Sequence, residues 1–417
     1  MTRKMAALGL LAVTVLAAGA WAETHYEAEP VLKAADLVGP EILRGPRYTV
    51  DSRVPVKGFL YRFAIRSDFG TLDAHGIHML QIRVREIYAL GQLEDMSKTK
   101  EFAEAAGNAI ARPVTSTVNM LVNPVETITG LPDGVGRLFD RIELGSEKVY
   151  QAATAPGASG GEQVADVSKR VGGIAVTALG YEKERRDLAK GLGVDPYTTN
   201  PVLAKKLDDM AWVAFSGRFG IQAATSVVMP YSTVMSAVTI TNSTVYETPA
   251  ADLINKAKVT FVATGASDAA VTALMKNPQY SLSVLAALAQ GCQRLQGVNG
   301  VASVVGFAAI ARTQDETRGV TAAVNMLARH HETVEPITLV SAPGPIIGRT
   351  AGGKLVLPAP VDYIAWTERA ARIVEREDLK APRRSAWLSG RMSHLAAREF
   401  RARGWSVDES HSIGAER

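Results

Sequence analysis

Two short groups of histidine and acidic residues offer metal chemistry in this sequence. Asp73, His75 and His78 are close together in the chain, and a second group, His330-His331-Glu332, ends a predicted helix. If the two groups met, His331 would join the three earlier residues in a mixed imidazole and carboxylate site with open positions for zinc or copper. A histidine near a helix C-terminus is also favoured by the helix dipole alone. We therefore predict no cofactor, and a divalent metal ion is the open alternative.

A hydrolytic site in the C-terminal half is the second chemical hypothesis. Its base would be His331, and Ser267 and Asp268 would lie near the pocket because they follow a predicted strand. Parallel sheets place ligands at the carboxyl ends of their strands.

Other motif matches fail on context. Gly157–Gly161 has the letters of a nucleophile elbow, but no strand precedes it and no helix follows it. Ser97 and Lys100 fit S-x-x-K without the partner K-T-G motif, and no G-x-G-x-x-G or P-loop sequence occurs. Asp195, Thr198 and Asn200 offer oxygens for a calcium loop, but a second carboxylate and the terminal Glu are missing, so capping and turn chemistry suffice to explain these residues.

The first 22 residues have the pattern of a secretory signal peptide. Arg3 and Lys4 precede an uncharged run, and Ala20-Trp21-Ala22 places small residues before a cleavage point at Glu23. The apolar run is short for a membrane span, and no cysteine near the cut would accept a lipid. We expect a periplasmic or secreted protein.

Composition agrees with an exported, folded chain. The sequence has 417 residues, 47% of them hydrophobic and 21% charged, enough for two or more domains. Its net charge of +4 falls to +2 without Arg3 and Lys4, which argues against nucleic-acid binding. Cys292 is the single cysteine, so no internal disulfide can form, and its apolar helical surroundings predict a buried structural thiol.

The expected fold class is mixed α/β. An N-terminal domain (23–150) begins with an ordered arm. It continues as a hairpin of strands near Tyr61–Ile65 and His78–Arg85, then helices. Residues 151–166 are small and Gly-rich and predict a flexible linker.

The second predicted domain covers residues 167–376. It starts with a helix–loop–helix in which Asn200-Pro201 opens the second helix. The uncharged stretch 219–246 reads as buried helix passing into strand, with a membrane span as the alternative. Apolar runs at Val259–Thr264 and Val301–Ile310 predict strands that alternate with helices.

Its C-terminal part completes a partly parallel sheet with packed helices. A capping box at Thr313 starts a helix, Ile337–Val340 is a strand, and a hairpin turns at Gly352-Gly353.

The C-terminal segment (377–417) is basic and amphipathic. The stretch from Lys380 to Trp405 contains seven basic residues and one acidic residue, with aromatic residues between them. We favour a peripheral helix packed on the body with its arginines in water, and contact with anionic lipid or another envelope component is the alternative.

Two functions follow from these observations. The first is a non-catalytic envelope protein that binds a partner or serves a structural role. The second is an exported hydrolase with its site in the α/β half.

Overall fold

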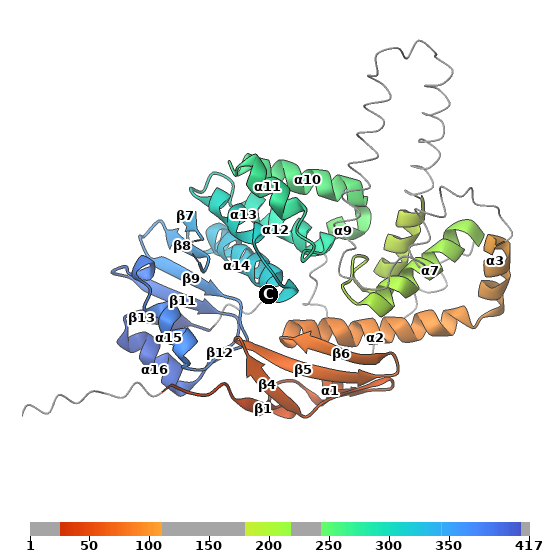
Figure 1. The fold of residues 1–417 in the computed structure, drawn as a ribbon, viewed down its shortest axis with the longest axis horizontal. Coiled ribbons are helices and arrows are strands. Elements are labelled where there is room, and N and C mark those ends of the chain that lie inside the picture. The colour runs from red at the N-terminus through yellow and green to blue at the C-terminus, as the bar shows by residue number, and fades with distance from the viewer. Residues whose placement is uncertain (1–25, 111–179, 218–242, 343, 410–417) are drawn as a thin grey trace, which may run out of the picture.

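The computed structural model describes residues 26–110, 180–217, 243–342 and 344–409 (Figure 1). The predicted signal peptide, the linker at 151–166, the Gly157–Gly161 motif and most of the stretch 219–246 lie outside these residues. The chain is a mixed α/β protein. It has an N-terminal sheet with a long helix, a helical centre, and a C-terminal partly parallel sheet with packed helices.

The N-terminal sheet is antiparallel, and its longest strand is β5 (Leu60–Ser67). Its strand order is β1-β4-β5-β3-β2, and β6 pairs with β5. The other strands are β1 (Val31–Lys33), β2 (Arg44–Gly45), β3 (Tyr48–Val50), β4 (Arg53–Lys57) and β6 (Gly70–His75), with the short helix α1 (Pro40–Leu43). Side chains of β5 alternate between buried and more exposed positions, as predicted for a half-buried strand.

The predicted second strand at His78–Arg85 is wrong, because helix α2 (Ile77–Ser97) occupies that stretch. Leu80 and Val84 are both fully buried. Residues four apart share a face in a strand and in a helix alike, so the short pattern could not separate the two. The partner of β5 is instead β6, which runs antiparallel to it from Gly70 to His75.

Helix α2 belongs to two hydrophobic cores. Its first half packs against the N-terminal sheet through Leu80 and Val84. Its second half packs, through Leu90 and Leu93, against helical residues 180–192 and helix α7 (Pro201–Gly217). A shorter helix, α3 (Lys100–Ile110), follows α2.

The predicted helix–loop–helix is confirmed. Residues 180–192 are helical, residues 193–200 form a loop, and α7 starts at Pro201. The side-chain oxygen of Asn200 accepts hydrogen bonds from the backbone N–H groups of Val202 (3.1 Å) and Leu203 (3.3 Å), as an N-cap does.

The central unit is helical where strands were expected at Val259–Thr264 and Val301–Ile310. Most of the first stretch lies in α10, and the second forms α13. Nearly every residue of α13 is apolar, so its sequence carries no usable period. Its burial at positions 301, 304, 305 and 308 has the spacing of a helix. The helices are α9 (Ser243–Glu247), α10 (Ala250–Ala263), α11 (Asp268–Met275), α12 (Leu282–Arg294), α13 (Val301–Ala309) and α14 (Gln314–Thr333).

Two predictions in this unit are confirmed. The Thr313 hydroxyl accepts a hydrogen bond from the N–H of Glu316 (3.2 Å) at the start of α14. Cys292 is 2% exposed within α12, and burial raises the pKa of its thiol to about 12, so the thiol is structural.

The C-terminal sheet has the strand order β13-β11-β9-β8-β7. β9, β11 and β13 are parallel, and β7, β8 and β9 form an antiparallel meander that includes the predicted hairpin. Its strands are β7 (Ile337–Ser341), β8 (Ile347–Thr350), β9 (Leu355–Ala359), β11 (Arg384–Leu388) and β13 (Trp405–Asp408). A small parallel pair, β10 (Tyr363–Ile364) and β12 (Arg391–Met392), and the helices α15 (Glu368–Val374) and α16 (His394–Ala402) complete the unit.

The separate basic tail predicted for 377–417 is wrong as a unit. Residues 384–408 supply two strands of the parallel sheet and α16, and Trp387 and Trp405 are buried. Arg384 and Arg403 lie over the rings of Trp405 and Trp366, at 5.1 and 4.5 Å from the ring centroids. Only α16 matches the expected peripheral helix.

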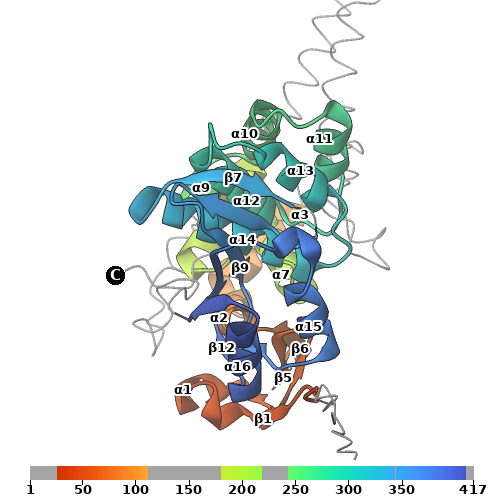
Figure 2. The ribbon, with the colours of Figure 1, turned by 90° about the vertical axis from the view of Figure 1, so that its left-hand side faces the viewer.

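The units are stacked in space. In Figures 1 and 2 the N-terminal sheet lies at the bottom and α10 and α11 at the top. The C-terminal sheet lies between them, at the left of Figure 1 and facing the viewer in Figure 2. Within the described ranges, we find no helix with the length and apolar character needed to cross a bilayer.

Candidate functional site

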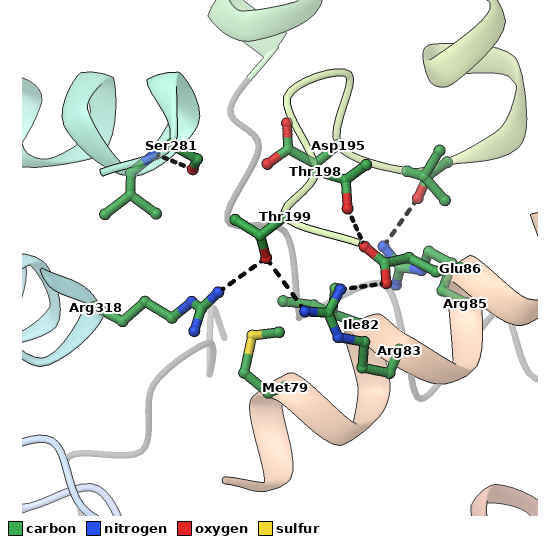
Figure 3. Close-up of a pocket in the computed structure, with 13 residues that line it drawn as sticks. Met79, Ile82, Arg83, Arg85, Glu86, Asp195, Thr198, Thr199, Ser281 and Arg318 are labelled. Atoms are coloured by element: carbon green, nitrogen blue, oxygen red, sulfur yellow. Dashed lines mark hydrogen bonds and ion pairs between the residues drawn. The ribbon is translucent and has the colours of Figure 1, made fainter. Parts of the chain in front are cut away.

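A recess opens where four elements from distant parts of the chain meet, and Figure 3 shows its lining. Its walls come from α2, the loop 193–200, the start of α12 and the first turns of α14. It is a small, partly open recess with a cavity volume of about 40 Å³. The lining residues are Met79, Ile82, Arg83, Arg85, Glu86, Gly193, Val194, Asp195, Thr198, Thr199, Ser281, Val284 and Arg318.

Two guanidinium groups converge on one hydroxyl in this recess. Arg83 Nη2 and Arg318 Nη2 each lie 3.2 Å from Thr199 Oγ1, to which both donate hydrogen bonds. Arg83 projects from α2 and Arg318 from α14, so their approach depends on the packing of both helices around the loop (Figure 3). Two arginines on a neutral partner leave positive charge directed at the recess.

Glu86 fixes the loop that carries Thr199. Its carboxylate is 2% exposed and accepts hydrogen bonds from Arg83 Nη1 (2.6 Å), Asn200 Nδ2 (3.0 Å) and the hydroxyl of Thr198. A buried carboxylate is tolerated when it is paired and hydrogen-bonded in this way. The role of Glu86 is therefore to hold the loop and one arginine in place.

Asp195 is a second acid in the lining, and it has a different environment. Its Oδ1 accepts hydrogen bonds from Ser283 Oγ (2.6 Å) and from the N–H of Tyr197 (2.8 Å). Among the described residues, no Lys, Arg or His forms an ion pair with this carboxyl group, although the charge of Arg185, which pairs with Asp208, favours its ionised form. Burial raises the pKa of Asp195 above its ordinary value.

Burial and the positive charges that line the recess also change the titration of neighbouring groups. Burial and the charge of Arg83 lower the pKa of Arg318 to about 10. Burial, with the charges of Arg318 and Arg85, lowers the pKa of His78 to about 4. His78 is therefore neutral at pH 7, although it lies close to the recess.

A neighbouring cluster is centred on Asp315, in the first turn of α14. Its Oδ2 lies 2.6 Å from His75 Nδ1 and 2.8 Å from Arg62 Nη1, and its Oδ1 lies 3.8 Å from Arg318 Nη1. Although burial alone would raise it, the hydrogen bonds from His75 and Arg62 lower the pKa of Asp315. This acid ties the N-terminal sheet to α14.

The four residues predicted to bind a metal ion do not form one group. Across the part of the chain that the structure describes, no three His, Cys, Asp or Glu side chains are placed to hold a metal ion. His75 pairs with Asp315, and Asp73 is exposed on β6. His331 accepts the N–H of Ile337 at Nδ1 (2.9 Å), which joins the end of α14 to β7.

The structure shows no contact between the predicted hydrolytic residues Ser267 and Asp268 and the predicted base His331, among the residues it describes. Ser267 caps α11 by accepting the N–H of Ala270, and Asp268 follows it in the first turn. No hydrogen bond or ion pair between described residues joins either one to His331. His75 is held in position by its contact with Asp315, as the histidine of a hydrolytic triad would be. Within the described ranges, however, no hydroxyl or thiol that could act as the nucleophile is hydrogen-bonded to it.

Sequence reasoning missed the arginines of the recess. Arg83, Arg85 and Glu86 are charged residues within a helix that buries both of its halves, and this signal could have indicated a polar site. The oxygen-rich loop around Asp195 was a second signal. Nothing in the sequence indicated that Arg318 would meet them.

Comparison of the chain with protein-family models, with curated proteins and with solved structures finds no match. The functional argument therefore depends on the site itself.

Proposed function

We propose that this protein is a non-catalytic binding protein of the cell envelope that takes up a small anionic ligand in the recess. The observation that carries the proposal is the convergence of Arg83 and Arg318 on Thr199. Guanidinium groups recognise carboxylate and phosphate oxygens through paired, charge-assisted hydrogen bonds.

Charge supports this choice of ligand. Arg318 has one acid within ion-pair distance among the described residues, Asp315 at 3.8 Å, and that acid is shared with Arg62 and His75. The lowered pKa of Arg318 means that its positive form is disfavoured where it stands. Arg318 is still charged at pH 7, and a bound anion would stabilise that charge.

The proposed envelope location depends on the predicted signal peptide, and the proposal of an envelope partner depends on it too. The exposed arginines of the C-terminal unit, Arg391, Arg398 and Arg401, are the residues that would contact anionic lipid. Protein recovered from the periplasm and beginning at Glu23 would agree with export.

Calorimetric titration of the purified mature protein with sodium acetate and sodium phosphate, at constant ionic strength set by NaCl, tests the anion site. We expect saturable binding, weakened at least tenfold by Arg318→Gln and less by Arg318→Lys, because lysine keeps the charge but not the planar donor pair. Arg372→Gln is the matched control, since Arg372 is exposed on α15 and pairs with Glu368. Absence of binding, or equal loss in the control, would overturn the proposal.

A further inference from the structure

We infer that the ligand is a zwitterion, an α-amino acid with an apolar side chain. Its carboxylate would meet Arg83 and Arg318, and its ammonium group would meet Asp195. This inference rests on the proposed anion site and adds a second charge to the ligand.

The first support is the separation of opposite charges within one recess. Figure 3 shows Thr199 between the carboxyl group of Asp195 and the guanidinium groups of Arg83 and Arg318. Both acids of the lining would repel a simple anion, but they differ in their partners. Glu86 already has Arg83 as its cation, whereas Asp195, among the described residues, accepts hydrogen bonds from a hydroxyl and a backbone N–H and forms no ion pair.

An ammonium group would supply the missing partner of Asp195. Transfer of a carboxylate from water into a buried position is costly unless a cation or several donors compensate it. Burial raises the pKa of Asp195, and the hydrogen bonds from Ser283 and Tyr197 and the charge of Arg185 offset the effect of burial only in part. The free oxygen positions of a carboxylate, which has room for about four hydrogen bonds, allow a further donor.

The third support is the apolar part of the lining. Met79 and Ile82, one helical turn apart on α2, and Val284 on α12 complete the recess beside the charged residues. Small-ligand sites combine such apolar surface with a few polar groups that fix orientation. An aliphatic or aromatic side chain of the ligand would pack against these three apolar residues, whereas a charged side chain would be desolvated there without a partner.

Two matched ligand pairs separate the zwitterion from the anion. L-leucine is compared with 4-methylpentanoate, and L-phenylalanine with 3-phenylpropionate, because each pair differs only in the amino group. Calorimetric titration at pH 7.5 should give at least tenfold tighter binding of the amino acid in one pair or both. The amine 3-methylbutylamine, which lacks the carboxylate, should bind more weakly than L-leucine.

The substitution Asp195→Asn removes the charge and keeps an oxygen that can accept from Ser283 and Tyr197. It should reduce the affinity for the preferred amino acid to that for its carboxylate analogue, and leave the analogue's affinity unchanged or improved. Asp187→Asn, which alters an exposed pair with Lys183 on helical residues 180–192, is the control. Circular dichroism of each variant checks that the fold is kept.

The possible failures are distinct. If neither amino acid binds more tightly than its analogue, or if Asp195→Asn leaves the preference intact, the zwitterion inference is wrong and the anion site stands. If the carboxylates, acetate and phosphate also fail to bind, the proposed function itself is wrong.

Discussion

Arg318 lies between an acid that attracts it and an arginine that repels it. Asp315 is 3.8 Å from one end of its guanidinium group, while Arg83 shares Thr199 with the other end. Small changes of charge near these side chains therefore change the balance, because interactions in a partly buried site are screened less than at the surface. The ligand proposals and the titration of His78 depend on this same imbalance.

His78 makes stability dependent on pH. Its pKa is about 4 in the folded protein and 6.5 when unperturbed, so the unfolded chain binds the proton more tightly. The resulting stability is fully present above pH 6.5 and is lost as the pH falls through 4. A shift of this size corresponds to up to about 3 kcal/mol, at 1.36 kcal/mol for each unit.

Urea unfolding of the wild type and of His78→Gln at pH 7.5 and pH 4.5 measures this contribution. Between pH 7.5 and pH 4.5, we expect the free energy of unfolding of the wild type to fall by about 2 kcal/mol more than that of the variant. His394→Gln, at an exposed position on α16, should behave as the wild type does. Equal acid sensitivity of His78→Gln and the wild type would contradict the expectation.

Among the elements, β11 is an interior strand of the C-terminal sheet that links two parts of the molecule. It lies between β9 and β13, and its Ala386, Trp387 and Leu388 are each at most 3% exposed. Trp387 also stacks on His330 of α14, with ring centroids 4.1 Å apart. The segment expected to be peripheral therefore joins the parallel sheet to the helical unit.

A chain that ends at Leu379 should lose its native fold. The truncation removes β11, α16 and β13 and uncovers the buried faces of β9 and α15. Burial of apolar surface contributes about 25 cal/mol for each Å², so the free energy lost by uncovering several side chains exceeds the usual free energy of unfolding. Circular dichroism and thermal unfolding should show no cooperative transition. A chain ending at Glu409, which keeps every strand of the sheet, is the control, and a cooperative transition in the shorter chain would refute the prediction.

Over the whole molecule, a few acids join parts of the chain that are hundreds of residues apart. Glu27 accepts hydrogen bonds from the N–H of Trp366 and the hydroxyl of Ser393. Asp362 accepts the N–H groups of Tyr61 (2.9 Å) and Ile77 (3.3 Å), and its burial raises its pKa to about 6. With Asp315, these contacts attach the N-terminal arm and sheet to the C-terminal half.

Glu27→Ala tests how much this attachment contributes. The change leaves the Trp366 N–H and the buried Ser393 without an acceptor, so we expect a loss of about 1–3 kcal/mol in the free energy of unfolding. Glu29→Ala is the matched control, because Glu29 is in the same arm and, among the described residues, accepts a single hydrogen bond, from the exposed N–H of Gly58. Urea unfolding measures both, and an equal effect of the two changes would contradict a specific role for Glu27.

The sequence by itself determined those features that depend on neighbouring residues. The caps at Thr313 and Asn200 satisfy nearby N–H groups, the hairpin turns within a few residues, and the strand Tyr61–Ile65 shows its two faces by alternation. The mixed fold class followed from the same local signals. Each of these is decided within about one turn of helix or one pair of strands.

Only the tertiary structure decided which residues form the site. Arg83, Thr199 and Arg318 are separated by more than one hundred residues at each step, and no local pattern encodes their meeting. The largely apolar run at Val301 became a helix because of what it packs against. The basic C-terminal segment became part of the sheet, where its Trp387 and Trp405 are buried. Where burial and long-range pairing set the outcome, propensity and period are too weak to predict it.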